Sequence, residues 1–401
     1  MYFGKTYYII VTFFLCCASS FSQDEFSSSY VDVKSYQLYE AKDWDALILL
    51  TDSALEKGID YYYLRMRIGI ALYEQKKYLI AKNHFEKAIE FNSFEDLPKE
   101  YLFYCYFFTD HFEESRTLAR TFSPDLKKKL YKNWRAVDLF SGEGGTKMTT
   151  SSEVPNAQYF QASLGHFIAN RVYVYHAYTY YHQGTMQDWL WTINQHQYFI
   201  KASMPLKNDW NLAVSFHGIG RILQTYAISY NSYPKPYDPM STSNFVESFS
   251  LRKSVGKFDY TIGSTVLWLD SLYQFQHDMS ATYYPFANKK LALGGVFYVH
   301  TKNRYSQLNF AIVPYVSFKP SSKISFYASY LYNQGNNIAE WNGLLVNNSP
   351  DLTTGRLTLN ATVRLTEDWD LSATYQYEMK QSIYTSDYTF NSIFIGLKFK
   401  L

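Results

Sequence analysis

A chain of 401 residues has room for two domains or for one large one. Its hydrophobic fraction of 47% comes with a mean hydropathy of −0.29, which argues against a helical membrane protein with several long apolar runs. The net charge of +2 gives no general attraction for a polyanion, and we expect no nucleic-acid partner. The 40 Tyr and 30 Phe favour strands and membrane–water interfaces, although a Tyr-rich soluble β protein would have the same composition.

The first residues have the pattern of a secretory leader. Lys5 precedes an apolar stretch over residues 7–18, which is too short to span a bilayer comfortably. Small residues follow it, with Ser22 last among them. We therefore predict a signal peptide over residues 1–22, with cleavage before Gln23.

The cysteines allow one alternative to that leader. Cys16 or Cys17 would be the lipid acceptor of a lipoprotein, but neither follows the small residue that such an acceptor needs. Only Cys105 remains in the mature chain, so we expect no intramolecular disulfide, although a periplasmic protein would be able to form one.

Residues 28–130 have a helical pattern that repeats at an offset of 34 residues. Trp44, Tyr78 and Phe112 align at this offset. In the clearest copy, small residues alternate with large ones along one helix face; the packing positions are Tyr78, Ala81, Phe85 and Ala88. A small residue lets the paired helix approach while the aromatic rings fill the space beside it. These residues resemble the tetratricopeptide (TPR) pattern, and the alternative is an ordinary small helical bundle.

From Ala157 onward the hydrophobic period changes to two. Apolar and polar residues alternate through about ten positions in the segments 273–283, 356–365 and 371–380. Strands of this length with one apolar face are typical of transmembrane barrels, whose lumen is polar. A soluble sandwich or propeller would alternate too, but its strands are usually about five or six residues long.

Turn lengths predict the arrangement of these strands. Short polar turns recur at 168–171, 205–209, 255–257, 287–290, 320–323 and 366–369, and the longest loops are 223–244 and 335–353. Short turns on one side and long loops on the other are typical of outer-membrane barrels, in which the short turns are periplasmic. Thirteen strands can be drawn after Ala157, and an even number needs one more, for which 135–147 is the only candidate. We expect 14 strands over residues 135–401, with 12 as the alternative.

The last strand has an apolar face made of Ile393, Ile395, Leu397, Phe399 and Leu401. This face resembles the C-terminal signal that the barrel-assembly machinery reads by strand pairing. We therefore expect that machinery and outer-membrane lipid to be partners. The fold class is α + β multidomain, in which TPR-like helices precede the barrel.

No catalytic, cofactor or metal motif emerges, so we expect neither an enzyme nor a cofactor. The nine histidines lack metal-binding spacing, and residues 142–145 (GEGG) lack the Lys and Ser/Thr of a phosphate loop, so a strand end or tight bend explains them better. The remaining candidates are charges predicted to line the lumen: Asp259, Asp278, Arg356, Arg364, Glu378 and Lys380. They would act as selectivity groups or simply pair with each other. Four tryptophans are predicted to form an interfacial girdle: Trp189, Trp191, Trp210 and Trp268.

The domain order, the repeat residues and the last strand together resemble the YaiO-like outer-membrane β-barrel proteins. The order also resembles exopolysaccharide exporters that join periplasmic TPR modules to a barrel. The resemblance implies outer-membrane localisation with the helices in the periplasm, and a role in envelope or exopolysaccharide export. The repeats would bind a periplasmic protein partner or guide a polysaccharide toward the lumen. The alternative is a non-transporting anchor or scaffold whose repeats recruit a periplasmic or surface complex.

Overall fold

The computed structural model describes residues 26–130, 135–184, 191–229, 232–269, 271–302, 307–333, 337–347, 351–382 and 386–400. The chain forms two compact units, one ending at Leu102 and the other beginning at Phe103. The predicted boundary lay near residue 130, so the structure groups the last helices with the barrel. The predicted signal peptide, Trp189 and Leu401 lie outside the described residues.

Seven helices precede the strands in the described chain: α2 (Ser28–Glu40), α3 (Trp44–Glu56), α4 (Tyr62–Glu74), α5 (Tyr78–Phe91), α6 (Leu97–Phe108), α7 (Phe112–Leu118) and α8 (Pro124–Leu130), with the short 3₁₀ helix η1 (Ala119–Thr121) before α8. The starts of α3, α5 and α7 lie 34 residues apart. Lys42, Lys76 and Asp110, in the turns before these helices, share a positive φ of 55–59°. The offset seen in the sequence is therefore also an offset in backbone structure.

The core of the first unit places small residues against rings. Ala81, Phe85 and Ala88 are fully buried on α5, while Tyr78 is partly exposed. Gly69 on α4 lies so close to Phe85 that a Cβ there would be 2.7 Å from its Cε1 atom. Large and small residues therefore interlock where the two helices meet.

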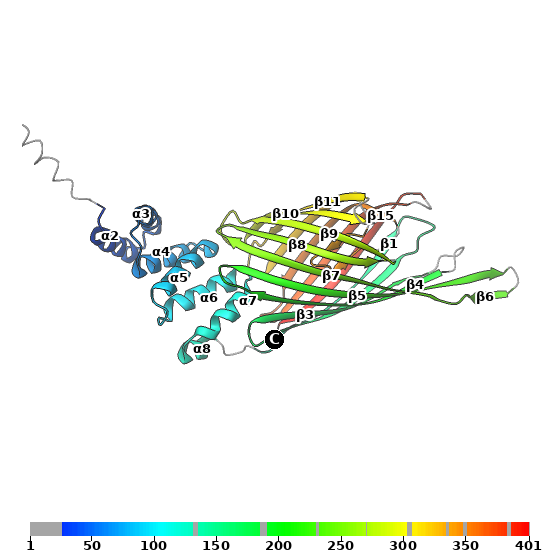
Figure 1. Ribbon diagram of the computed structural model, residues 1–401, viewed down its shortest axis with the longest axis horizontal. Coiled ribbons are helices and arrows are strands. Elements are labelled where there is room, and N and C mark those ends of the chain that lie inside the picture. Colours follow the sequence, from blue (N-terminus) through cyan, green and yellow to red (C-terminus); the bar gives the residue numbers. More distant parts are fainter. Residues whose placement is uncertain are drawn as a thin grey trace, which may run out of the picture. The chain divides into compact units, whose positions relative to one another are not determined.

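Fourteen antiparallel strands form a closed barrel (Figure 1). They are β1 (Val137–Thr149), β2 (Ala157–Ile168), β3 (Val172–Gln183), β4 (Trp191–Pro205), β5 (Trp210–Ser229), β7 (Met240–Val255), β8 (Phe258–Leu269), β9 (Leu272–Tyr283), β10 (Leu291–Lys302), β11 (Gln307–Phe318), β12 (Ile324–Asn333), β15 (Leu352–Arg364), β16 (Trp369–Gln381) and β17 (Tyr388–Lys400). Strand β1 closes the barrel by pairing with β17. The count of 14 is confirmed, including the first strand with its poor alternation.

The GEGG segment is part of a continuous strand, not the strand end or bend that its sequence favours. Close packing explains one of its glycines, because a Cβ on Gly145 would clash with the Phe394 ring. Residue 394 belongs to β17, the strand that closes the barrel against β1. The absence of a side chain at 145 therefore permits the closure.

Alternate side chains of each strand point outward, and on most strands they are apolar. On β9, Tyr273 and Met279 are more than half exposed, whereas the intervening Gln274 and Gln276 are buried inside. In the last strand, the outward residues Ile393, Ile395 and Leu397 are all exposed. This arrangement inverts that of a soluble protein, and it characterises a barrel of the outer-membrane type.

Short turns gather at one end of the barrel, which we call the helix end because helix α8 leads into β1 there. Positive φ angles at Ala169, Asn170, Asn208 and Asp209 close two of these turns tightly. The opposite, loop end differs from the prediction at 223–244. There β5 continues to Ser229, β6 (Ser232–Pro236) pairs with it, and Figure 1 shows the resulting hairpin extending beyond the other strands.

Candidate functional site

A short hairpin folds into the barrel lumen. It consists of β13 (Ala339–Glu340) and β14 (Leu345–Val346), and it lies within the segment that the sequence predicted as a long loop. The Gln276 side chain, on β9, holds it twice: its Nε2 donates to the Ala339 carbonyl at 2.6 Å, and its Oε1 accepts from the Ala339 amide at 3.0 Å. The Gln276 side chain thus bonds to both backbone groups of Ala339, as the backbone of a neighbouring strand would.

The tip of the hairpin is held by strand β5. Ser215 donates to the Asn342 carbonyl at 2.5 Å, and His217 Nδ1 lies 2.7 Å from the Gly343 carbonyl oxygen. Gly343 has a φ of +80°, and a Cβ there would lie 3.0 Å from Val246 Cγ1. The tip therefore requires glycine both for its backbone conformation and for space.

Three of the predicted lumen charges meet beside this hairpin. Arg356 Nη2 lies 2.5 Å from Glu340 Oε1 of the hairpin, and Arg356 Nη1 lies 3.8 Å from Glu378 Oε1. Lys147 lies 2.7 Å from the other Glu378 oxygen, and Lys380 donates to Thr353 at 2.6 Å. The sequence did not single out Lys147 or Glu340, because nothing in their local patterns indicates that they face this cluster.

The other three predicted charges lie apart. Asp259 is buried near the helix end, where it accepts from Ser254 at 2.5 Å. Arg364 pairs with Asp370 where β15 ends. Asp278 lies against Gly263, where a Cβ would be 2.6 Å from both carboxylate oxygens.

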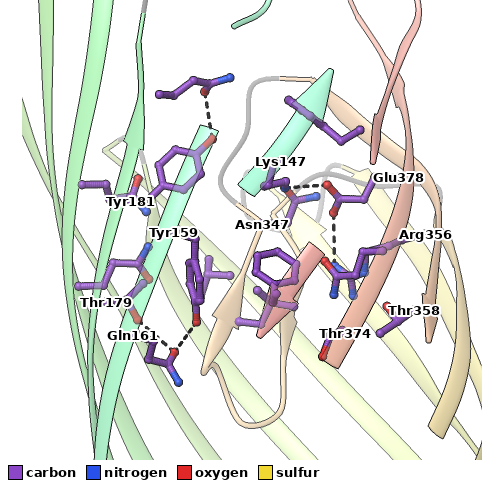
Figure 2. Close-up of a pocket in the computed structure, with 18 of the residues that line it drawn as sticks. Lys147, Tyr159, Gln161, Thr179, Tyr181, Asn347, Arg356, Thr358, Thr374 and Glu378 are labelled. Carbon is purple, nitrogen blue, oxygen red and sulfur yellow. Dashed lines mark hydrogen bonds and ion pairs between the residues drawn. The ribbon is translucent and has the colours of Figure 1, made fainter. Parts of the chain in front are cut away.

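A cavity of about 770 Å³ lies between the hairpin and the wall formed by strands β1 to β5 and β15 to β17 (Figure 2). We call it the chamber. Its polar lining consists of Glu143, Lys147, Gln161, Thr179, Gln183, Gln195, Gln197, Arg221, Asn347, Asp351, Arg356, Thr358, Asn360, Thr374, Gln376, Glu378 and Lys380. Its rings come from Tyr159, Tyr181, Trp191, Tyr327, Trp341, Tyr388, Phe390 and Phe394.

Amides and rings are interleaved along the chamber wall. Gln161 accepts from the Tyr159 hydroxyl at 2.7 Å and from Thr179 at 3.1 Å, and Tyr181 donates to Gln183 at 3.1 Å (Figure 2). These bonds hold the rings and the amides in place, and the Gln183 amide nitrogen donates in turn to the Pro155 carbonyl at 2.9 Å. Trp191 was predicted to belong to the interfacial girdle, but its side chain lines the chamber.

Helix α7 packs against the helix end of the barrel. Glu114 is buried and lies 2.6 Å from Arg252 of β7. On either side, Ser203 donates to Glu113 at 3.0 Å, and Arg116 pairs with Asp138 of β1 at 2.9 Å. Asn211 of β5 also donates to Glu114, at 3.5 Å, so this one short helix makes polar contacts with four barrel strands.

A second set of polar side chains, Asp259, Tyr284 and Lys289, stabilises a turn at the helix end. Tyr284 donates to Asp259 at 2.9 Å and accepts from Lys289 at 2.8 Å. Burial and the Asp259 carboxylate raise the pKa of the Tyr284 hydroxyl, so it remains a proton donor. Burial lowers the pKa of Lys289 despite the attraction of the same carboxylate.

Within the described residues, no cluster of three or more His, Cys, Asp or Glu side chains has the geometry to hold a metal ion. None of the described helices is long and apolar enough to cross a bilayer.

No protein-family model matches the sequence, and no curated protein does either. Solved structures that resemble the fold include the CymD monoaromatic hydrocarbon channel, at 7% identity and a TM-score of 0.48, covering 71% of this chain and 91% of that one. Others are the Pseudomonas putida toluene transporter TodX (7%, 0.47, 67% and 90%) and a bacterial polysaccharide outer membrane secretin (9%, 0.39, 67% and 100%). At such identities and scores, these likenesses carry no argument about a solute. What the chain's own strands establish is a closed 14-stranded β-barrel of the outer-membrane type.

Proposed function

We propose that this protein resides in the outer membrane and carries a gated path for a saccharide, as part of envelope or exopolysaccharide export. The observation that carries the proposal is the chamber, where amide side chains and aromatic rings alternate. Sugar hydroxyls both donate and accept hydrogen bonds, as amides do, and the C–H faces of sugar rings pack on aromatic rings. The volume of about 770 Å³ falls within the range of about 300–1,000 Å³ that is common for ligand sites.

The charges of the lining favour a polar ligand with little net charge. The cations Lys147, Arg356 and Lys380 stand beside the Glu378 carboxylate, and the hairpin adds the Glu340 carboxylate. A hydrocarbon would displace water from these charges and amides without offering them any further hydrogen bond, at a free-energy cost. A strongly anionic or cationic ligand would meet charges of both signs.

Two closures define the proposed gates. The β13–β14 hairpin borders the chamber on one side, and helix α7 occupies the helix end. Neither is paired with the barrel sheet. Hydrogen bonds and ion pairs hold both, and Ala339 and Val346 of the hairpin also pack on an apolar cluster of the wall. Releasing them would leave the strand pairing of the barrel wall intact. Passage of a polymer would need both to move.

We further propose that the helix end faces the periplasm and that the helices preceding the barrel lie there. Short turns at that end agree with the usual outer-membrane asymmetry. The 34-residue spacing of helix starts supports a TPR-like module, and the resemblance to YaiO-like proteins has the same domain order. Such a module would present a surface to a periplasmic protein partner or to the polysaccharide.

A second function is favoured by one observation. The Glu114–Arg252 ion pair joins α7 to β7 through a buried carboxylate and a half-buried guanidinium. A permanently closed barrel would serve as a membrane anchor, and the helices would recruit a complex. The difference between conduit and anchor is whether the lumen can open.

Planar-bilayer conductance tests the proposal. Residues 338–346, which form the hairpin, would be replaced by a short Gly-Ser linker, and the β6 hairpin at the rim would be shortened as the matched control. We expect low conductance for the wild type and the control. The variant without the inner hairpin should conduct steadily and admit neutral gluco-oligosaccharides in liposome-swelling assays. A folded variant that still fails to conduct or to admit sugars would favour the anchor.

A further inference from the structure

One flank of the barrel carries polar groups on its outward face. Outward side chains of β3 and β4 include His176, Tyr178, Tyr180, His182, Asn194, His196 and Tyr198, and Tyr178, His196 and Tyr198 are exposed. We call this set the histidine–tyrosine flank. The outward faces of β15 to β17 are mainly apolar and bear one polar pair, Tyr375 and Asn391. Their apolar residues are Leu359, Val363, Leu371, Ile393, Ile395 and Leu397. A lipid-facing wall should be apolar all round, so the flank calls for a different neighbour.

The groups of the flank bond partly to each other. His176 Nδ1 lies 2.7 Å from the Tyr198 hydroxyl, and its Nε2 lies 3.1 Å from His166 Nε2. The Tyr178 hydroxyl lies 2.7 Å from His196 Nδ1. His196 is exposed, and its second ring nitrogen has no hydrogen bond to another of the described residues, so it is available to another partner.

A carboxylate lies on the same side of the barrel. Glu247 of β7 is exposed, alternates with the inward Val246 and Ser248, and makes no ion pair within the described residues. A charge that faces lipid is destabilising and usually marks a functional contact. Lipid tails offer no donor for this carboxylate.

Strand β5 separates the flank from Glu247. Gly218 pairs with Tyr198 on one side, and Gly220 pairs with His196. A Cβ on either glycine would make only ordinary contacts, at 3.5 Å and 3.8 Å. The barrel itself therefore does not require glycine here, but a shallow strip without side chains lets another surface approach closely.

We propose that this face binds a second copy of the chain around a two-fold axis that runs beside Gly218 and Gly220. In such a dimer, the histidine–tyrosine flank of each copy faces Glu247 of the other, so that each contact occurs twice. In a two-fold dimer of parallel barrels, His196 of one copy and Glu247 of the other must lie at similar distances from the helix end. His196 lies nine residues from Pro205, at the helix end of β4, and Glu247 lies eight residues from Val255, at the helix end of β7.

A second copy suits this face because donor and acceptor lie on the same molecule, two strands apart. A two-fold contact is self-complementary, and an imidazole N–H opposite a carboxylate meets that condition. Hydrogen bonding across the dimer removes the unpaired carboxylate from lipid. The proposed dimer contact lies on the outer wall of the barrel, so it does not depend on which ligand the chamber binds.

Disulfide cross-linking in isolated membranes tests the contact. In a Cys105→Ala background, Gly220→Cys should cross-link rapidly to a dimer under mild oxidation, whereas Val363→Cys on the apolar flank should remain monomeric. Equal rates for the two positions would overturn the proposal. A cross-linked product with a different protein would also overturn it, because it would assign the face to another partner.

Charge exchange keeps the test independent of simple misfolding. Glu247→Lys should weaken the dimer at least tenfold in analytical ultracentrifugation in detergent, and adding His196→Glu should restore it. Heat-modifiable migration on gels confirms that each barrel is folded. A wild type that is monomeric at all concentrations, or a folded double variant that is no more dimeric than Glu247→Lys, contradicts the reciprocal contact.

Discussion

The guanidinium of Arg356, on the barrel wall, lies 2.5 Å from the carboxylate of Glu340, on the inserted hairpin. Both side chains are buried, so removing either partner leaves the other charge in a poorly solvated place. The pair is the direct charged link between the hairpin and strand β15. It is therefore the contact through which a single substitution should loosen the proposed inner gate.

Glu340→Gln should destabilise the seated hairpin by about 3–5 kcal/mol at most, the cost of breaking a buried ion pair. We expect brief openings in single-channel recordings, at voltages where the wild type is silent. Asp370→Asn is the matched control, because Asp370 pairs with Arg364 and Lys400 at the helix end and does not touch the hairpin. Equal activity in both variants would mean that the hairpin is not the gate.

Glu114→Ala should release helix α7 from the mouth, because Arg252 would lose its buried partner. Backbone amides of residues 112–118 should exchange hydrogen at least tenfold faster in hydrogen–deuterium exchange. Glu113→Ala serves as control, since Glu113 accepts a single bond from Ser203 on this side of the helix. Unchanged exchange in Glu114→Ala would show that other contacts hold the closure.

Adjacent residues of β15 test which face meets lipid. Leu359→Arg places a charge outward and should destabilise the barrel by about 2–4 kcal/mol if it lies near the bilayer midplane. Asn360→Arg places the same side chain in the polar chamber and should be tolerated. Heat-modifiable migration after refolding into lipid measures the difference, and similar yields would contradict the observed facing.

Ala81→Trp should overpack the first unit, because Ala81 is fully buried beside Phe85. We expect a cost of about 1–3 kcal/mol, seen as faster tryptic cleavage within residues 26–102. Lys87→Trp, at an exposed position of the same helix, should leave cleavage unchanged. The barrel should still assemble, and its loss in Ala81→Trp would mean that the two units fold together.

Lowering the pH should destabilise the first unit, residues 26–102, through protonation of His84. Burial and the nearby Arg65 guanidinium lower the pKa of His84 from 6.5 to about 4. The unfolded chain therefore binds this proton more tightly, and stability falls as the pH drops from about 6.5 to 4, by at most about 3 kcal/mol. Hydrogen exchange of α4 and α5 should accelerate over this range in the wild type and less so in His84→Gln. Parallel profiles would rule out His84 as the cause.

The sequence was sufficient to predict the barrel, because its determinants are local and periodic. Alternation along each strand sets which side chains face outward, as at Leu359 and Asn360, and turn lengths set the strand count. The 34-residue offset likewise reappears in the starts of α3, α5 and α7. Each of these properties is a regular spacing along the chain, so one sequence read alone reveals it.

Only the tertiary structure could place the inner hairpin, the α7 closure and the chamber. Glu340 meets Arg356, and Glu114 meets Arg252, across separations of 16 and 138 residues, and neither pair has a local signature. The sequence alone also misplaced Trp191. Near a loop, a shift of one residue in where the strand begins decides whether a ring faces lipid or lumen. Closing 14 strands brings distant side chains together in the lumen, where burial gives each charge a specific partner. Period and turn length contain no information about which charges those are.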